Sequence, residues 1–290
     1  GDLLDRALEA EVIRPRATVL PVMTSLAVLP QWDYSNQANG ARAGLTLAWM
    51  AEGAEGTPQV PKLVPATMKM HKGAIWINLS NELAEDAGPA AERRIGTAMR
   101  NAVSAGLDLA FVFGNGAGKP QGIMLSPALI TVSKEGSQSA ATIVEDNIVK
   151  MAARLHPACW GNSVWLVSPT CLAQLLKLSQ ASGPLGGGRT ALLTERDGTL
   201  FLLTRPVLTT DACAPLGTTG DIILADLSKY LVALRSDARI ETSIHSGWMT
   251  DERGVRLILR LNGQSDWHKP ITLRDGTNTV SCFVALETRG

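Results

Sequence analysis

The segment that most resembles a chemical motif is the glycine-rich stretch 114–122, which contains one lysine, Lys119. Backbone N–H groups of such glycines, together with a lysine, can hold the phosphates of a nucleotide. Both phosphate-binding patterns fail here, because Phe113 stands at the first glycine position, Pro120 follows the lysine, and Lys119 replaces a third glycine. The segment also follows a predicted helix, whereas both motifs precede one. We therefore expect a turn, and a nucleotide-handling enzyme is kept only as a distant alternative, which a nucleotide-binding titration would test.

The other reactive residue types lack the spacing of a catalytic or metal site. The cysteines form no CxxC pair and are expected to be reduced core residues. The histidines show no HxxxH or HExxH spacing, and no GxSxG nucleophile motif is present. We therefore predict no catalytic residue, no metal and no cofactor. The residues concerned are Cys159, Cys171, Cys213, Cys282, His71, His156, His245 and His268.

Composition indicates a globular chain without a global charge bias. Of its 290 residues 45% are hydrophobic, so it can bury a real core. Its 27 lysines and arginines balance 27 aspartates and glutamates, which argues against a dedicated nucleic-acid reader but not against a protein that only encloses DNA. The longest apolar run, 102–113, is too short to span a bilayer, and no signal peptide is visible. We expect a soluble protein made inside the cell, with no membrane partner.

The N-terminal region is expected to be an irregular arm over residues 1–40. Pro15, Pro21 and Pro30 break every candidate helix there. Such a segment buries little by itself, so it is expected to lie on another surface. The sequence begins at Gly1 without a methionine. A trimmed sequence explains this start, and so does proteolytic removal of an N-terminal segment.

A long β-hairpin loop is predicted next. Strand-like stretches 43–50 and 66–77 flank the small, acidic, turn-rich segment 51–58. An isolated hairpin is marginally stable in water, so this loop needs a surface to rest on, which a neighbouring copy can supply. Two tryptophans are candidate interface anchors: Trp49 beside the loop and Trp248 beside a later turn.

A long helix is predicted to begin at Pro89, because proline suits the first turn of a helix. An apolar stripe follows at three- and four-residue steps, with Asp108 expected elsewhere on the circumference. The stripe consists of Ala91, Ile95, Ala98, Met99, Ala102, Gly106 and Leu109.

A mixed α/β block is predicted after residue 140. A capping box at Thr142 starts a helix that Pro157 stops, and a second helix starts at Ser168. From Asp221 onward the chain is rich in predicted strands, with Asp251, Glu252 and Arg253 at a turn. The order of elements indicates an α+β fold with an inserted lobe. The block also contains a buried strand over 164–167, a flexible loop over 183–188 and a hairpin turn at 197–198.

Taken together, four stretches in this order resemble the major capsid family of tailed bacteriophages, which has the Hong Kong-phage capsid fold. Each stretch is weak alone, but together they span most of residues 40–290. They are LSNELAED at 79–86, DLAFVFGNG at 108–116 with KPQGI at 119–123, GDIILADLSKY at 220–230, and Ile240-Glu241 on to Asp251 with Arg256 and Arg260.

The resemblance implies a division into four regions. They are an N-terminal arm (1–40), an extended loop that reaches onto the adjacent subunit (41–78), a peripheral domain with a long spine helix and a β-sheet (79–124 and 236–290), and an inserted axial α/β domain (125–235). The chain would self-assemble as pentamers and hexamers into the icosahedral head that encloses the phage genome. It would be found in the virion, and in the host cytoplasm during assembly.

The resemblance also implies assembly contacts, which we expect at three places. The extended loop would contribute Trp49, Glu52, Glu55 and Pro58. The turn at the three-fold axis would contribute Trp248, Asp251, Glu252 and Arg253. The loop at the capsomer centre would contribute Gly186, Gly187 and Arg189.

Other partners follow from the family as well. They are a portal, a cement or decoration protein, and a maturation protease whose processing site would be Gly1; double-stranded DNA would be enclosed without sequence-specific binding. Covalent cross-linking through a lysine in the loop is not expected, because no lysine lies between Arg42 and Lys62. An encapsulin-type nanocompartment shell would share the fold, and the particle's contents would distinguish it.

Overall fold

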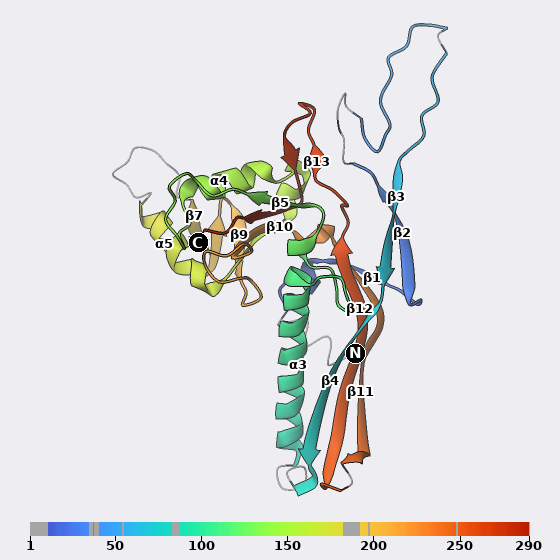
Figure 1. The fold of residues 1–290 in the computed structure, drawn as a ribbon, viewed down its shortest axis with the longest axis vertical. Helices are drawn as coiled ribbons and strands as arrows, with labels where there is room; N and C mark the ends of the chain where they lie inside the picture. The colour runs from blue at the N-terminus through green and yellow to red at the C-terminus, as the bar shows by residue number, and fades with distance from the viewer. Residues whose placement is uncertain are drawn as a thin grey trace. The chain divides into compact units, whose positions relative to one another are not determined.

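The computed structural model describes residues 11–34, 37, 41–53, 55–82, 88–181, 192–196, 198–247 and 249–289, which form a mixed helix and sheet fold (Figure 1). The chain divides into two compact units. The first unit contains residues 1–27, 67–122 and 231–264, and the second contains 28–66, 123–230 and 265–290. Short 3-10 turns cover Arg14–Arg16, Ile123–Leu125, Pro157–Asn162, Pro169–Cys171 and Leu227–Lys229.

The first unit is built on a four-stranded sheet with the order β1-β11-β12-β4. Strand β12 (Glu252–Ser265) runs antiparallel to β4 (His71–Ser80). Strand β1 (Thr18–Pro21) pairs in parallel with β11 (Tyr230–Gly247). The expectation of a wholly irregular arm is therefore wrong. Pro21 fits because it ends a short strand at the edge of the sheet, where a missing N–H is tolerated.

Helix α3 (Gly88–Phe113) confirms the long helix predicted from Pro89, and Figure 1 shows it running along β4. The expected apolar stripe is wrong, however, because Ala98, Ala102, Gly106 and Leu109 are exposed. Among the stripe residues whose burial the structure describes, only Met99 is buried. The helix turns a different face to the core because the Asp108 side chain is buried against the N-terminal segment, where it accepts the hydrogen bonds described below. The buried face consists of Met99, Val103, Ser104, Leu107, Asp108, Phe111 and Val112.

A tight glycine turn ends α3, as the sequence predicts. The N–H of Gly122 donates to the carbonyl of Gly114 at 2.7 Å, and that of Gly116 donates to Pro120 at 3.3 Å. A Cβ atom at Gly114 would overlap the Pro120 carbonyl oxygen, and one at Gly122 would overlap that of Val112. The glycines are needed because two backbone segments approach each other too closely for a side chain.

We expect Gly122→Ala to lower the free energy of unfolding by about 2–3 kcal/mol, because overpacking forces backbone shifts. Denaturant unfolding would measure the loss. Gly106→Ala is the matched control, since no atom lies within 4 Å of its added Cβ. This control should stabilise the helix by about 0.5–1 kcal/mol. Equal stabilities for the two variants would contradict the steric explanation.

The second unit is built on a seven-stranded sheet with the order β5-β15-β10-β6-β9-β8-β7. Its central strands β6, β10 and β15 are fully buried, which confirms the buried strand expected over 164–167. The turn between β7 and β8 confirms the expected hairpin. The strands are β5 (Leu129–Val132), β6 (Ser163–Val167), β7 (Leu193–Arg196), β8 (Thr199–Leu202), β9 (Arg205–Thr209), β10 (Ile222–Asp226) and β15 (Phe283–Leu286).

Two helices belong to this unit, α4 (Glu145–Arg154) and α5 (Leu172–Ala181). The capping box expected at Thr142 is wrong, because α4 begins three residues later. The Asn147 side chain accepts the N–H of Val144 at 3.1 Å, while the Thr142 hydroxyl donates to the Ser139 carbonyl instead. All four cysteines are buried and free, as expected for core residues.

A two-stranded sheet of β2 (Leu26–Trp32) and β3 (Leu63–Lys69) leads into the long loop. The strand expected over 43–50 is wrong, since the described residues there contain only an isolated bridge between Arg42 and Leu45. Positive φ angles at Ala43 and Gly44 turn the chain at this point and prevent a regular ladder. A further small sheet joins β13 (Ile271–Thr272) and β14 (Thr279–Val280).

The observed division differs from the expected regions, most clearly in the placement of two strands. Strand β4 pairs with β12 in the sheet of the first unit, whereas residues 71–78 were expected to belong to the extended loop. Strand β15 lies between β5 and β10 in the second unit, whereas the expected division placed it with 79–124. Both assignments depend on pairings between residues far apart in the sequence.

Candidate assembly surfaces

The long loop between β2 and β3 is held in shape by one side-chain amide. The Gln59 side chain accepts the N–H of Thr46 at 2.6 Å and donates to the Thr46 carbonyl at 2.9 Å. Nearer the base, the N–H of Lys62 donates to the carbonyl of Ala43 at 2.8 Å. The amide thus reproduces the two hydrogen bonds of a backbone pair, so the two arms stay together without a β-ladder.

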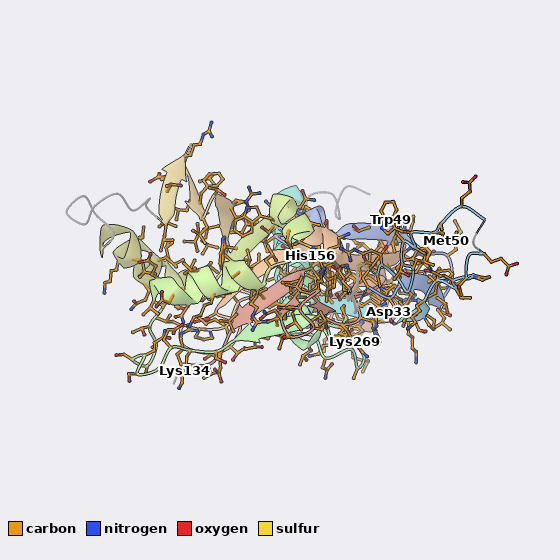
Figure 2. The ribbon with its side chains drawn as sticks, turned by 90° about the horizontal axis from the view of Figure 1, so that it is seen from above. Asp33, Trp49, Met50, Lys134, His156 and Lys269 are labelled. Atoms are coloured by element: carbon orange, nitrogen blue, oxygen red, sulfur yellow. The ribbon has the colours of Figure 1, made fainter. Side chains whose placement is uncertain are left out.

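The outer part of this loop exposes large apolar side chains. Leu47 is 79% exposed, Trp49 90% and Val60 80%, and Figure 2 shows Trp49 and Met50 on the loop. The other residues predicted as loop contacts, Glu52, Glu55 and Pro58, are exposed as well. Apolar groups clustered on an extended loop are typical of a surface that another molecule covers.

The base of the loop is attached to the segment 265–272 of the same unit. The Gln31 amide donates to the Ser265 carbonyl at 3.3 Å. His268 Nε2 lies 3.5 Å from an Asp33 carboxylate oxygen, and the N–H of Gln37 donates to the Thr272 carbonyl at 3.2 Å. These contacts position the loop, so its outer end is presented from a fixed base.

The turn between β11 and β12 is connected to β4 through Asn81. The Asn81 side chain donates to the Asp251 carboxylate at 2.5 Å and accepts from Arg253 Nε at 2.5 Å. Asp251 has a positive φ of 52°, and its carbonyl also accepts the N–H of Asn81 at 3.0 Å. The structure therefore brings together two of the residues predicted at the three-fold turn, Asp251 and Arg253, while Glu252 begins β12 beside them.

The N-terminal segment is attached to α3 by a buried carboxylate. Asp108 accepts the backbone N–H groups of Val12 at 2.9 Å and Ile13 at 3.2 Å. Glu11 and Arg14 form a buried ion pair at 2.6 Å beside it. Ile13 is fully buried, so apolar burial reinforces the polar attachment.

This attachment is expected to weaken as the pH rises through about 7. Burial raises the pKa of Glu11 from 4.5 to about 7, although the charge of Arg14 opposes the shift, and burial also raises the pKa of Asp108. A carboxyl group whose pKa is raised in the folded state contributes stability that is full below its unfolded pKa and is lost as the pH passes the folded value. Protection of the Val12 and Ile13 amides from hydrogen exchange, corrected for intrinsic rates, should therefore be several-fold higher at pH 6 than at pH 8.

Glu11→Gln is the matched control for this pH dependence, because it keeps an acceptor for Arg14 but does not titrate. The variant should show a smaller change in amide protection between the two pH values. Equal changes in the variant and the unaltered chain would show that Glu11 is not responsible.

Several residues predicted as contacts lie outside the described residues, namely Gly1, Gly186, Gly187, Arg189 and Trp248. Conversely, sequence reasoning missed Asn81 and Gln59, whose roles depend on contacts across the fold. In the described part of the chain, no cluster of His, Cys, Asp and Glu side chains could hold a metal ion. No described helix is long and apolar enough to cross a membrane.

Comparison with solved structures shows which known proteins have a similar fold. The chain is similar to the capsid protein of a native GTA particle, with 16% identity, 96% of this chain and 90% of that chain covered, and a TM-score of 0.71. It is also similar to a protein of Mycobacterium phage Cain, with 15% identity, coverage of 96% and 90%, and a TM-score of 0.66. No curated protein sequence matches. At such identities the structural likeness shows the fold alone.

The family assignment comes from a separate match along the sequence. The model of the "Phage capsid family" matches residues 1–271, which is nearly the whole chain of 290 residues. The resemblance inferred from residues 79–86, 108–123, 220–230 and 240–260 is thereby confirmed. The chain therefore belongs to the phage capsid family and is a structural major capsid protein.

Proposed function

We propose that copies of this chain assemble as pentamers and hexamers into an icosahedral head that encloses double-stranded DNA without reading its sequence. The observation that supports this proposal is the long loop with its exposed Leu47, Trp49 and Val60. A polypeptide gains stability from these groups only when another surface covers them. In the proposed head that surface belongs to a sister copy. Assembly takes place in the host cytoplasm, and the finished protein is part of the virion.

The regions of the chain take the following roles in this proposal. Residues 1–40 form an arm, 41–70 the extended loop, 71–124 with 236–264 the peripheral domain, and 125–235 with 265–290 the axial domain. The axial loop that contains Gly186, Gly187 and Arg189 lies at the capsomer centre. A portal, a cement or decoration protein and a maturation protease that generates Gly1 are the further partners.

The turn between β11 and β12 is proposed to meet its counterparts at a local three-fold axis, through Trp248, Asp251, Glu252 and Arg253. Arg253→Glu reverses one charge, so like charges would face each other and reduce the yield of closed particles. Arg253→Lys keeps the charge and is the control. Asn81→Ala removes the side chain that links Asp251 to Arg253 within one chain, and it changes no charge. This variant therefore distinguishes an effect on the local structure of the turn from an effect on assembly. Unchanged particle yield and stability for Arg253→Glu would refute the contact.

Electron microscopy of the purified protein tests the function directly. Closed polyhedral particles are expected, and a permanently monomeric species under native conditions would exclude the proposed role. The contents of the particles distinguish a phage head from an encapsulin-type compartment, which would enclose enzymes instead of DNA. The family match reported above favours the phage head, because the matching model is that of the phage capsid family.

A further inference from the structure

The sheet of the first unit has a charged face and an apolar face. Arg256 and Arg260 alternate along β12 with Leu257, Leu259 and Leu261, and all three leucines are buried. Because alternate residues of a strand point to opposite faces, the leucines share the apolar face. That face lies toward α3, since Leu259 and Leu261 line a hollow together with residues of the helix.

This hollow, which we call the helix–sheet hollow, has a volume of about 210 Å³ and an apolar wall. Val103 and Leu107 of α3 and Leu259 and Leu261 of β12 contribute buried side chains to the wall. Strand β4 contributes Ile75. Water gains few hydrogen bonds in such a space, whereas a small apolar molecule fits it.

The hollow exists because the helix residues that face it are small. Ala102, Gly106 and Ala110 follow one another on successive turns of α3 along it. No residue packed across from Gly106 comes within 4 Å of a Cβ atom added there. On the sheet side, by contrast, a Cβ atom at Gly73 would lie 3.0 Å from Leu259 Cδ1. The unfilled space therefore lies on the helix side, and it costs stability because the atoms that line it lose packing contacts.

Two lysines lie at the mouth of the hollow. Lys72 of β4 and Lys119 of the glycine turn line it and are exposed. Within the described part of the molecule, neither lysine forms an ion pair and no carboxylate lines the hollow. His71 also lines it, but burial and the charge of Lys69 lower the pKa of this imidazole, so it is neutral at pH 7. The fixed charge at the mouth is therefore positive.

We propose that the helix–sheet hollow binds a small anionic amphiphile of the medium-chain fatty-acid class, with its chain between α3 and β12 and its carboxylate at Lys72 and Lys119. The volume limits the chain length, since the hollow is smaller than the roughly 300–1,000 Å³ of sites for drug-sized ligands. Burial of methylene groups supplies affinity, and the two lysines select an anionic head. This inference goes beyond the proposed function, because it does not depend on contacts between copies.

A side chain from a neighbouring copy is the competing occupant. An apolar side chain would fill the inner part of the hollow, but it would leave both lysines without a counter-charge. Nucleic acid fails for the opposite reason, because its phosphates would pair with the lysines and leave the apolar wall uncovered. An anionic amphiphile matches the wall and the mouth together, so we favour it.

Titration of the chain with decanoate tests the site. We expect saturable binding below about 1 mM, and binding of the uncharged 1-decanol that is at least about tenfold weaker. Lys72→Gln with Lys119→Gln should remove most of this preference for decanoate, because the counter-charges are gone. Absence of saturable decanoate binding, or equal affinity of the unaltered chain for the two probes, would overturn the proposal.

A filling variant tests the place of binding. Gly106→Leu fills the hollow from the helix side and should weaken decanoate binding at least about tenfold. The variant should remain folded, since the hollow holds the added carbons and glycine disfavours a helix. Ala105→Leu is the matched control, because Ala105 is exposed on α3 and does not line the hollow. Undiminished decanoate binding by Gly106→Leu would place the ligand elsewhere and contradict the assignment.

Thermal unfolding supplies a second measurement. Decanoate should raise the Tm of the unaltered chain and of Ala105→Leu, since a ligand that binds only the folded state stabilises it. It should leave the Tm of Gly106→Leu unchanged. If no chain responded to decanoate and Gly106→Leu alone failed to form particles, the hollow would be assigned to a side chain of a neighbouring copy and the amphiphile would be rejected.

Discussion

Replacing Arg289 with alanine is expected to lower the free energy of unfolding by about 3–5 kcal/mol, because it leaves a buried charge without its partner. Arg289 and Asp221 form an ion pair whose side chains are completely buried. The same guanidinium donates to the carbonyl of Thr142 at 2.6 Å and to that of Glu287 at 3.0 Å. The N–H of Gly217 completes the site by donating to Asp221 at 2.9 Å. Removal of one side chain therefore leaves several buried acceptors without a donor.

Denaturant unfolding of the variants would measure this effect. Lys150→Ala is the control. The Lys150 ammonium lies 2.6 Å from a Glu135 carboxylate oxygen, but this ion pair is partly exposed to solvent, so it should contribute less than about 1 kcal/mol. The combined variant Arg289→Ala, Asp221→Ala should lose much less than the sum of the two single losses, since neither charge is then left alone. A loss below about 1 kcal/mol for Arg289→Ala would show that water or another group replaces the pair.

The local elements could be predicted from sequence because their signals lie within a few residues. Pro89 and the glycine turn mark the two ends of α3, and the apolar run of residues 164–167 indicates the buried β6. Signals of this kind failed where a distant residue changed the local preference. Asp108 is an example, since its charge predicts an exposed position. It is buried instead, and its carboxylate accepts hydrogen bonds from the backbone N–H groups of residues 12 and 13.

Prolines were misleading for a related reason. Pro21 and Pro30 exclude a helix, but they do not exclude an edge strand, and both lie in strands of the structure. Arg289 carried no signal at all, because its partner Asp221 is 68 residues away. Long-range pairs of this kind become visible only when the chain is folded.

The sequence predicted which residue types occur on the candidate surfaces, but it did not predict the contacts that support these surfaces. The small, acidic segment around Glu52 identified the outer end of the loop, and Trp49 is exposed as an interface anchor should be. The hydrogen-bonded support from Gln59 had no local signature. Arg256 and Arg260 alternate with leucines along one strand, a pattern that could have revealed the charged face of the sheet, since alternate residues share a face.

Deletion of residues 52–58 is expected to abolish closed shells while leaving soluble capsomers or monomers. In the proposed head the loop of every copy contacts one neighbour, and every copy is contacted by the loop of another. The deletion therefore removes binding free energy from every such subunit contact, and the effect multiplies over the shell. A loss of about 2 kcal/mol per contact already lowers each association constant about thirtyfold. The hydrogen bonds between Gln59 and Thr46 lie outside the deletion, so the base of the loop should persist.

Electron microscopy and sedimentation would count closed particles, and amide protection in the buried β6 and β10 would show that the second unit is still folded. A variant in which residues 52–58 are replaced by seven glycines and serines keeps the loop length and removes its side chains. Because assembly depends on the chemistry of these side chains and not on loop length alone, this variant should also fail to close shells. Normal particles after deletion would mean that subunits do not associate through this loop, and that the exposed Trp49 and Leu47 are covered by something other than a sister copy.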